Sequence, residues 1–176
     1  PRRQELCLYY IAHESQTKYI NKEDDLKDAF IRCAAAETFF AWHYYSSKNA
    51  NAQEQLKAGK IPPDFLRSMF YTYADYRDIC LNSDISKKEG DVKKAKDKID
   101  EIFPTIKPEN KTKRQEWWKK YGEDIWKGML CGLSHVFSGN DKETARTQLT
   151  ENVAYQYSKL KDDLEDFASR PQFLRW

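Results

Sequence analysis

The chain has 176 residues, of which 33% are charged and 40% hydrophobic, so a core can form beneath a heavily solvated surface. Thirty basic and 28 acidic residues leave a formal charge of +2, which argues against a nucleic-acid-binding protein with a strongly basic face. The sequence shows no signal peptide and no apolar run that could span a bilayer. The protein is therefore either soluble or targeted and anchored by segments outside this sequence.

The sequence predicts an all-α fold, an elongated bundle of about five or six helices joined by long loops. The first helix is expected over residues 2–20, where apolar and aromatic residues recur at spacings of three and four. The second is expected over residues 22–48, with Asn21 as its N-cap and Asp24 completing a capping box. The stripe that it should bury consists of Leu26, Phe30, Cys33, Glu37, Phe40 and Tyr44.

Further helices follow the break at Pro62 and Pro63. The helix with the Trp-rich sequence is expected to start at Thr112 as its N-cap. Gly128 and Gly132 lie four residues apart in that helix and can permit the close approach of another helix. The remaining helices are expected over residues 64–81, 92–103, 112–136 and 141–168.

No catalytic or metal site is predicted. The histidines lie on three different predicted helices without ligand-like spacing, no nucleophile has a recognised setting, and the sequence has no glycine-rich phosphate loop. The acidic residues Asp75, Asp78 and Asp84 resemble a metal site, but Arg67 and Arg77 lie near enough to favour ordinary ion pairs. We therefore expect no enzyme activity and no cofactor.

Glu37 stands out because it lies in the apolar stripe of the second predicted helix. An ionised carboxylate in such a place is costly unless it is paired. One interpretation is an internal ion pair that fixes the helix register, with Arg67 or Arg77 as the partner. Arg2 and Arg3 are alternative partners. The other interpretation is that Glu37 turns outward at the edge of the stripe, and the sequence leaves both open.

Two groups of residues have the composition of a ligand-binding surface. Trp117, Trp118 and Trp126 could stack a ligand, but aromatic residues at helical spacing favour a place in the core. The lysine-rich stretch Lys87–Lys98 could attract a sulfated polysaccharide, but the carboxylates interleaved with it favour a solvated face.

The four cysteines, Cys7, Cys33, Cys80 and Cys131, lie far apart in the sequence. No pair has the short C-x-x-C spacing of a zinc or redox site. Structural disulfides and buried thiols both fit this spacing, and the residues alone do not decide between them.

Five strings of the sequence together resemble the Duffy-binding-like domains of malarial erythrocyte adhesion proteins. These strings are PRRQELC at 1–7, CAAAETFFAWHYY at 33–45, FLRSMFYTYADYRDICLNSDIS at 65–86, RQEWWKKYGEDIWKGMLCGL at 114–133 and PQFLRW at 171–176. The amino-acid sequences of these strings are most similar to the Plasmodium falciparum erythrocyte membrane protein 1 family. ETFFAWHYY and IPPDFLRSMFYTYADYRDIC resemble its beta class.

The resemblance implies an extracellular module on the surface of infected erythrocytes that binds a host receptor. Intercellular adhesion molecule 1 is the first candidate, and antibodies are a further class of partner. Neither nucleic acid nor direct insertion into a membrane is expected. The resemblance also implies that residues 1–176 are the central helical part of one domain, truncated at both ends. Much of the receptor contact is then expected in a missing C-terminal subdomain, so no contact residue is assigned here.

The resemblance bears on the cysteines as well. Cys80 ends one predicted helix and Cys131 lies late in another, so two antiparallel helices could bring them together. Since the resemblance supports bridging in an extracellular domain, we predict a Cys80–Cys131 disulfide. It also implies that Cys7 pairs with a cysteine upstream of this chain. Cys33 would pair outside the chain too, or remain a buried thiol.

Three functions stay open at this point. The leading hypothesis is a rigid helical module that binds a host-cell receptor. The second is binding of sulfated glycans through the basic stretches Lys87–Lys98 and Lys107–Arg114. The third is a structural scaffold, or an antibody target, whose receptor contacts lie elsewhere.

Overall fold

The computed structural model describes residues 5–83, 89–104 and 109–175. In these ranges every regular element is a helix and there is no strand, which confirms the predicted all-α class. The described residues form nine α-helices, more than the five or six predicted, because two of the predicted helices are broken and one short helix was not expected.

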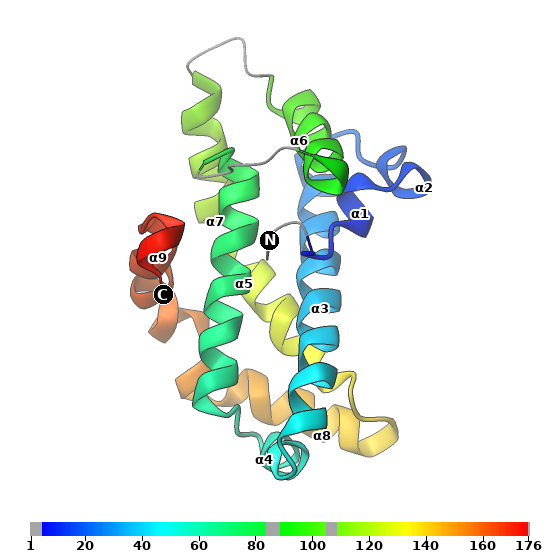
Figure 1. The fold of residues 1–176 in the computed structure, drawn as a ribbon, viewed down its shortest axis with the longest axis vertical. Helices are drawn as coiled ribbons and strands as arrows, with labels where there is room; N and C mark the ends of the chain where they lie inside the picture. Colours follow the sequence, from blue (N-terminus) through cyan, green and yellow to red (C-terminus); the bar gives the residue numbers. More distant parts are fainter. Residues whose placement is uncertain (1–4, 84–88, 105–108, 176) are drawn as a thin grey trace.

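Three long helices make the frame of the molecule: α3 (Glu23–Lys48), α5 (Pro63–Leu81) and α7 (Glu109–Ser134). Figure 1 shows α3 and α5 running side by side along the long axis, and α7 packs against both of them. The observed bounds of α3 and α5 lie within one residue of the prediction. α7 begins at Glu109, before the predicted N-cap Thr112.

The interface between α3 and α7 depends on glycine. A Cβ atom on Gly132 would lie 2.4 Å from the carbonyl oxygen of Ala35, and one on Gly128 would lie 2.8 Å from Cγ2 of Ile31. Only hydrogen atoms fit in these gaps, so the two helices approach backbone to backbone. The close approach predicted from the spacing of the two glycines is confirmed.

The N-terminal segment does not form the single helix predicted over residues 2–20. Its described part holds two one-turn helices, α1 (Tyr9–Ala12) and α2 (Glu14–Thr17), separated at His13. His13 has an extended backbone, and its ring Nδ1 accepts a hydrogen bond from the backbone N–H of Ser15. A local cap at His13 therefore ends one helix and starts the next.

The start of α3 differs by one residue from the predicted cap. The N-cap is Lys22, and Asp25 accepts hydrogen bonds from the backbone N–H groups of Asn21 at 3.0 Å and Lys22 at 3.1 Å. The expected carboxylate is thus present but comes from Asp25 instead of Asp24. It also lies where the positive end of the helix dipole favours negative charge.

The helix predicted over residues 141–168 is broken into α8 (Gly139–Glu151) and α9 (Tyr157–Ser169), with the 3-10 helix Val153–Tyr155 between them. Tyr155 causes the break through its tertiary contacts. Its hydroxyl accepts a hydrogen bond from the Ile61 N–H at 2.8 Å, and its carbonyl accepts one from Trp126 Nε1 at 2.8 Å. A continuous helix would use that carbonyl internally.

Two shorter helices complete the fold. The unexpected α4 (Ala52–Lys57) lies between α3 and α5 in the chain and contacts α8. α6 (Gly90–Ile102), predicted as a short basic helix, packs on α1, α3 and α5 at the opposite end of the long axis from α4.

The core is built from aromatic side chains. Trp117, Trp118 and Trp126 are 3%, 2% and 0% exposed, so the prediction that they belong to the core is confirmed. Trp118 packs edge-on against the ring of Tyr73, with 5.0 Å between ring centroids. Such contacts add to the free energy gained from burial alone.

Candidate functional site

A groove lined by cations lies between α7 and α9, over the C-terminal half of α5. It consists of two adjoining hollows of about 290 and 460 Å³, which share Arg77, Leu81 and Gln115. We call it the basic groove. Its charged lining residues are Arg77, Lys111, Lys119, Lys161 and Arg170, with Asp78 and Glu165 as the acidic ones.

Both carboxylates of the basic groove are bound by arginine. Asp78 is held by Arg175, and Glu165 Oε2 lies 3.4 Å from Arg77 Nε. Lys111, Lys119 and Lys161 have no ion pair with any other described residue. The groove therefore offers three uncommitted positive charges to the solvent, and it favours an anionic ligand.

The wall of the groove is fixed by a chain of hydrogen bonds between α5 and α9. The Tyr73 hydroxyl donates to Glu165 Oε1 at 2.9 Å and lies 3.3 Å from the Tyr157 hydroxyl. Burial, with the nearby Glu165 carboxylate, raises the pKa of Tyr73 well above its usual value. Gly122 makes room for these phenols, since a Cβ there would lie 2.5 Å from the Tyr73 oxygen.

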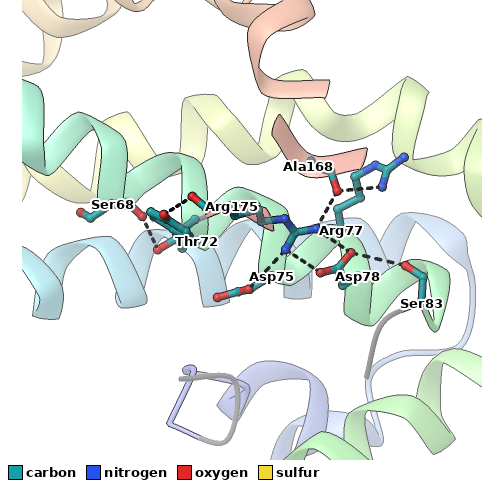
Figure 2. A network of polar contacts seen from close by, with 9 residues as sticks. Ser68, Thr72, Asp75, Arg77, Asp78, Ser83, Ala168 and Arg175 are labelled. Carbon is teal, nitrogen blue, oxygen red and sulfur yellow. Dashed lines mark hydrogen bonds and ion pairs between the residues drawn. The ribbon is translucent and has the colours of Figure 1, made fainter. Parts of the chain in front are cut away.

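Arg175 fastens the C-terminal segment to α5. Figure 2 shows its guanidinium between Asp78 and the carbonyl of Ala168. It donates to the two oxygens of Asp78 at 2.8 and 3.2 Å and to the Ala168 carbonyl at 2.6 Å. Asp75 adds a second carboxylate at 3.9 Å. All three charged side chains are buried, so their geometry must compensate for the loss of hydration.

A third polar joint fastens α6 to α5 and α7. Arg114 donates to Asp100 at 2.6 Å, to the Phe103 carbonyl at 3.0 Å and to the Cys80 carbonyl at 3.2 Å. Partial burial alone would raise the pKa of Asp100, but hydrogen bonds from Lys96 and Arg114 hold it below its usual value. The joint closes one end of the bundle.

The C-terminal half of α3 carries aromatic residues on the surface. We call Phe39, Phe40, His43 and Tyr44 the α3 aromatic face. Phe40 is 62% and Tyr44 67% exposed, which corrects the prediction that both continue the buried stripe. An open apolar hollow of about 350 Å³ adjoins this face, and Arg32 and His135 contribute to its lining. Exposed aromatic groups beside such a hollow are typical of protein interfaces.

The two cysteines predicted to pair lie far apart. All four cysteines are free thiols in the structure. The Cys80 carbonyl is bound by Arg114, near the start of α7, whereas Cys131 lies about 25 Å farther along that helix, at about 1.5 Å per residue. A disulfide needs Cα atoms within about 7 Å of each other. The predicted Cys80–Cys131 disulfide does not fit this arrangement.

The arginines proposed as partners of Glu37 have other partners. Arg77 pairs with Glu165, and Arg67 donates to the carbonyl of Arg175 at 3.4 Å. Glu37 Oε2 instead accepts a hydrogen bond from the backbone N–H of Cys7 at 2.8 Å. The alternative partners Arg2 and Arg3 lie outside the described residues.

The acidic cluster is explained by an arginine that the sequence did not suggest. Asp75 and Asp78 bind Arg175 instead of the expected Arg67 or Arg77, and Asp84 lies outside the described residues. In the described part of the chain, no group of His, Cys, Asp and Glu side chains could hold a metal ion. None of its helices is long and apolar enough to cross a membrane.

The basic stretch Lys87–Lys98 is largely neutralised where it is described. Lys93, Lys96 and Lys98 pair with Asp97, Asp100 and Glu101 at 2.6–2.9 Å. This favours the solvated face over a glycan site. The lysines of the basic groove were missed because they do not form a run. The spacing of Lys111, Gln115 and Lys119, four residues apart on one helix face, is the signal that could have identified them.

Comparison with protein-family models identifies a related family. The family model described as the Duffy binding domain matches residues 1–175. No curated protein and no solved structure matches the chain.

Proposed function

Because the chain belongs to the Duffy binding domain family, whose members are receptor-binding adhesion modules, we propose that it is a host-receptor-binding module displayed on infected erythrocytes. The match over residues 1–175 is the observation that carries this proposal. Intercellular adhesion molecule 1 is the first candidate receptor. The motif sequences described above support placing the chain in the beta class of the erythrocyte membrane protein 1 family.

The α3 aromatic face is the surface that best suits a protein receptor. Aromatic side chains dominate the binding energy of many protein interfaces, because they bury a large area with little loss of conformational freedom. Phe40 and Tyr44 are exposed on a helix that glycine contacts hold against α7. The face is therefore presented on a rigid support, which limits the entropy lost on binding.

The experiment is a binding assay of the chain against receptor ectodomains, with intercellular adhesion molecule 1 among them. The double variant Phe40→Ala/Tyr44→Ala should weaken binding by about tenfold or more, since it removes two anchors. Phe173→Ala, which removes an even more exposed aromatic residue elsewhere, should leave affinity unchanged. Equal binding by the double variant and the parent would exclude this face.

The same assay separates a receptor-binding module from a scaffold. A longer protein that contains this chain is tested beside the chain alone. Binding by the longer protein only, unaffected by the double variant, would mean that the receptor contacts lie outside residues 1–176. Failure of both proteins to bind any ectodomain would count against the adhesion function itself.

The basic groove supports sulfated-glycan binding as a second candidate function. Its three uncommitted lysines line two adjoining hollows, unlike the neutralised lysines of α6. Binding of a sulfated polysaccharide should weaken steeply with salt, because exposed charges are screened. The triple variant Lys111→Gln/Lys119→Gln/Lys161→Gln should abolish it, whereas Lys93→Gln/Lys98→Gln should not. Salt-independent binding would exclude this candidate.

A further inference from the structure

Cys7 and Cys33 meet at the junction of the N-terminal segment with α3. Cys7 lies two residues before α1, and Cys33 lies in the first half of α3. The backbone N–H of Cys7 is bonded to Glu37, four residues after Cys33 on α3, and a hydrogen bond between the two thiols is one cause of the pKa shift of each. They are 26 positions apart in the sequence, so tertiary structure and not local geometry brings them together.

The backbone of Cys7 is fastened on both sides of its side chain. Its N–H donates to Glu37 Oε2, one turn after Cys33 on α3, at 2.8 Å. Its carbonyl accepts a hydrogen bond from the buried hydroxyl of Tyr76 on α5 at 2.7 Å. These two bonds leave the segment little freedom to move the thiol away from Cys33. The arrangement is a preorganised thiol pair and not a chance contact of mobile groups.

The two thiols differ in exposure and acidity. Cys7 is half-buried, whereas Cys33 is fully buried. The hydrogen bond with Cys33 is the largest of the effects that lower the pKa of Cys7 from 9.0 to about 7, and burial opposes it. Burial raises the pKa of Cys33 well above 9.0. Near neutral pH a large share of the half-buried Cys7 is therefore thiolate, while Cys33 stays protonated.

We propose that Cys7 and Cys33 form a disulfide that ties the N-terminal segment to α3 when the protein meets a disulfide oxidant such as oxidised glutathione. The Cys7 thiolate attacks one sulfur of the oxidant, forming a mixed disulfide and releasing one thiolate. Cys33 then attacks the Cys7 sulfur, and the second oxidant thiolate leaves. The proton of Cys33 and the proton that Cys7 lost to solvent on forming its thiolate protonate the two released thiolates. Two protein thiols are oxidised, and one oxidant disulfide is reduced to two thiols.

The bond stabilises the fold through the unfolded state. Closing the loop between the two residues should lower the unfolding equilibrium constant by roughly a few hundred-fold in the chain-entropy model, before any strain is subtracted. The inference does not depend on receptor binding. It differs from the pairing expected from the family resemblance, in which Cys7 joins a cysteine upstream of this chain.

Peptide mapping without reduction tests the bond directly. The protein is refolded with a glutathione redox buffer, alkylated and cut with trypsin. The expected product is one linked pair, residues 4–18 joined to residues 33–48, while Cys131 is alkylated. Alkylation of both Cys7 and Cys33, or a link from Cys7 to any other cysteine, in this chain or in a longer protein, would overturn the proposal.

Thermal unfolding with and without a reductant supplies a second readout. The parent and the control Cys131→Ser should both lose melting temperature on reduction. Cys7→Ser and Cys33→Ala should show no such loss, whatever their own stability, because each is compared only with itself. A reductant-dependent shift that persists in Cys33→Ala would also contradict the proposed bond.

Discussion

The two faces of the helical frame are held by different forces. α7 meets α3 through Gly128 and Gly132, with Ile31 and Ala35 opposite, so the fit depends on volume. α9 and the C-terminal segment meet α5 through Tyr73, Arg77 and Arg175, so the fit depends on hydrogen bonds and charge. Added atoms should destabilise the first interface, and the loss of a polar partner should destabilise the second. The predictions below test that contrast.

The largest effect is expected from Arg175→Ala. The change leaves Asp78 buried without the arginine that binds both of its oxygens. Breaking a buried ion pair from one side typically costs about 3–5 kcal/mol. Urea unfolding should show this loss. Arg170→Ala, which removes an exposed pair with Asp166, should cost less than about 1 kcal/mol. Similar losses of unfolding free energy for the two variants would mean that the buried ion pair stabilises the fold no more than the exposed one.

Gly132→Ala tests the opposite interface. The added methyl meets a backbone oxygen of α3, which cannot turn aside, and overpacking costs about 1–3 kcal/mol. Gly128→Ala is the matched control, because its methyl meets Cγ2 of Ile31 at 2.8 Å and the nearest backbone oxygen only at 3.3 Å, against 2.4 Å for Gly132. Unfolding curves should give Gly132→Ala a lower free energy of unfolding than Gly128→Ala. The reverse order would show that side-chain packing limits the approach of α3 and α7.

Asp100→Asn tests the polar joint of α6 through pH. The pKa of Asp100 is lowered in the folded protein, so its contribution to stability is present above the unfolded value, near 3.8, and is lost as pH falls through the folded value. At pH 7 the variant should lose about 1.5–3 kcal/mol through its bonds with Lys96 and Arg114. The difference from the parent should shrink below pH 3.8. A difference that stays constant down to acid pH would refute an ionic contribution.

Tyr73→Phe should have the smallest effect, about 1 kcal/mol, since it removes one buried hydroxyl and leaves the ring in place. The loss should fall mostly on the α5–α9 contact, because Glu165 keeps its arginine. Hydrogen exchange can localise the loss of stability: amides in α9 should exchange faster than in the parent, and those in α3 should exchange at the same rate. Faster exchange in both helices would mean that the two interfaces unfold as one unit.

Sequence patterns predicted the fold where local periodicity and tertiary packing agree. α3 and α5 follow their apolar stripes and lie within a residue of their expected bounds. The break between α8 and α9 could not be predicted, because Tyr155 is held by Ile61 and Trp126, far away in the chain. In the C-terminal half of α3 the buried side is that of Thr38 and Trp42, opposite Phe40 and Tyr44, so the expected stripe followed the wrong side of the helix there.

The charged contacts were harder to predict than the helices. The sequence left Glu37 open between a paired and an outward-facing carboxylate, and it indicated ion pairs of Asp75 and Asp78 with Arg67 or Arg77. Their partners come from distant segments, the backbone of Cys7 and the side chain of Arg175, which carry no local signal of that role. Cys7 and Cys33 are a similar case, because only the folded α3 places one beside the other.

The attachment of Cys7 and Arg175 to the same turn of α5 has a mechanical consequence. Tyr76 holds the carbonyl of Cys7, and Asp78, two residues later, holds Arg175. Figure 1 shows the two segments on either side of that helix. A pull applied through both segments would therefore meet at one turn of α5, and the bond from Cys7 to Glu37 would pass part of the load to α3. An adhesion module under flow could thus spread such tension over two of its long helices.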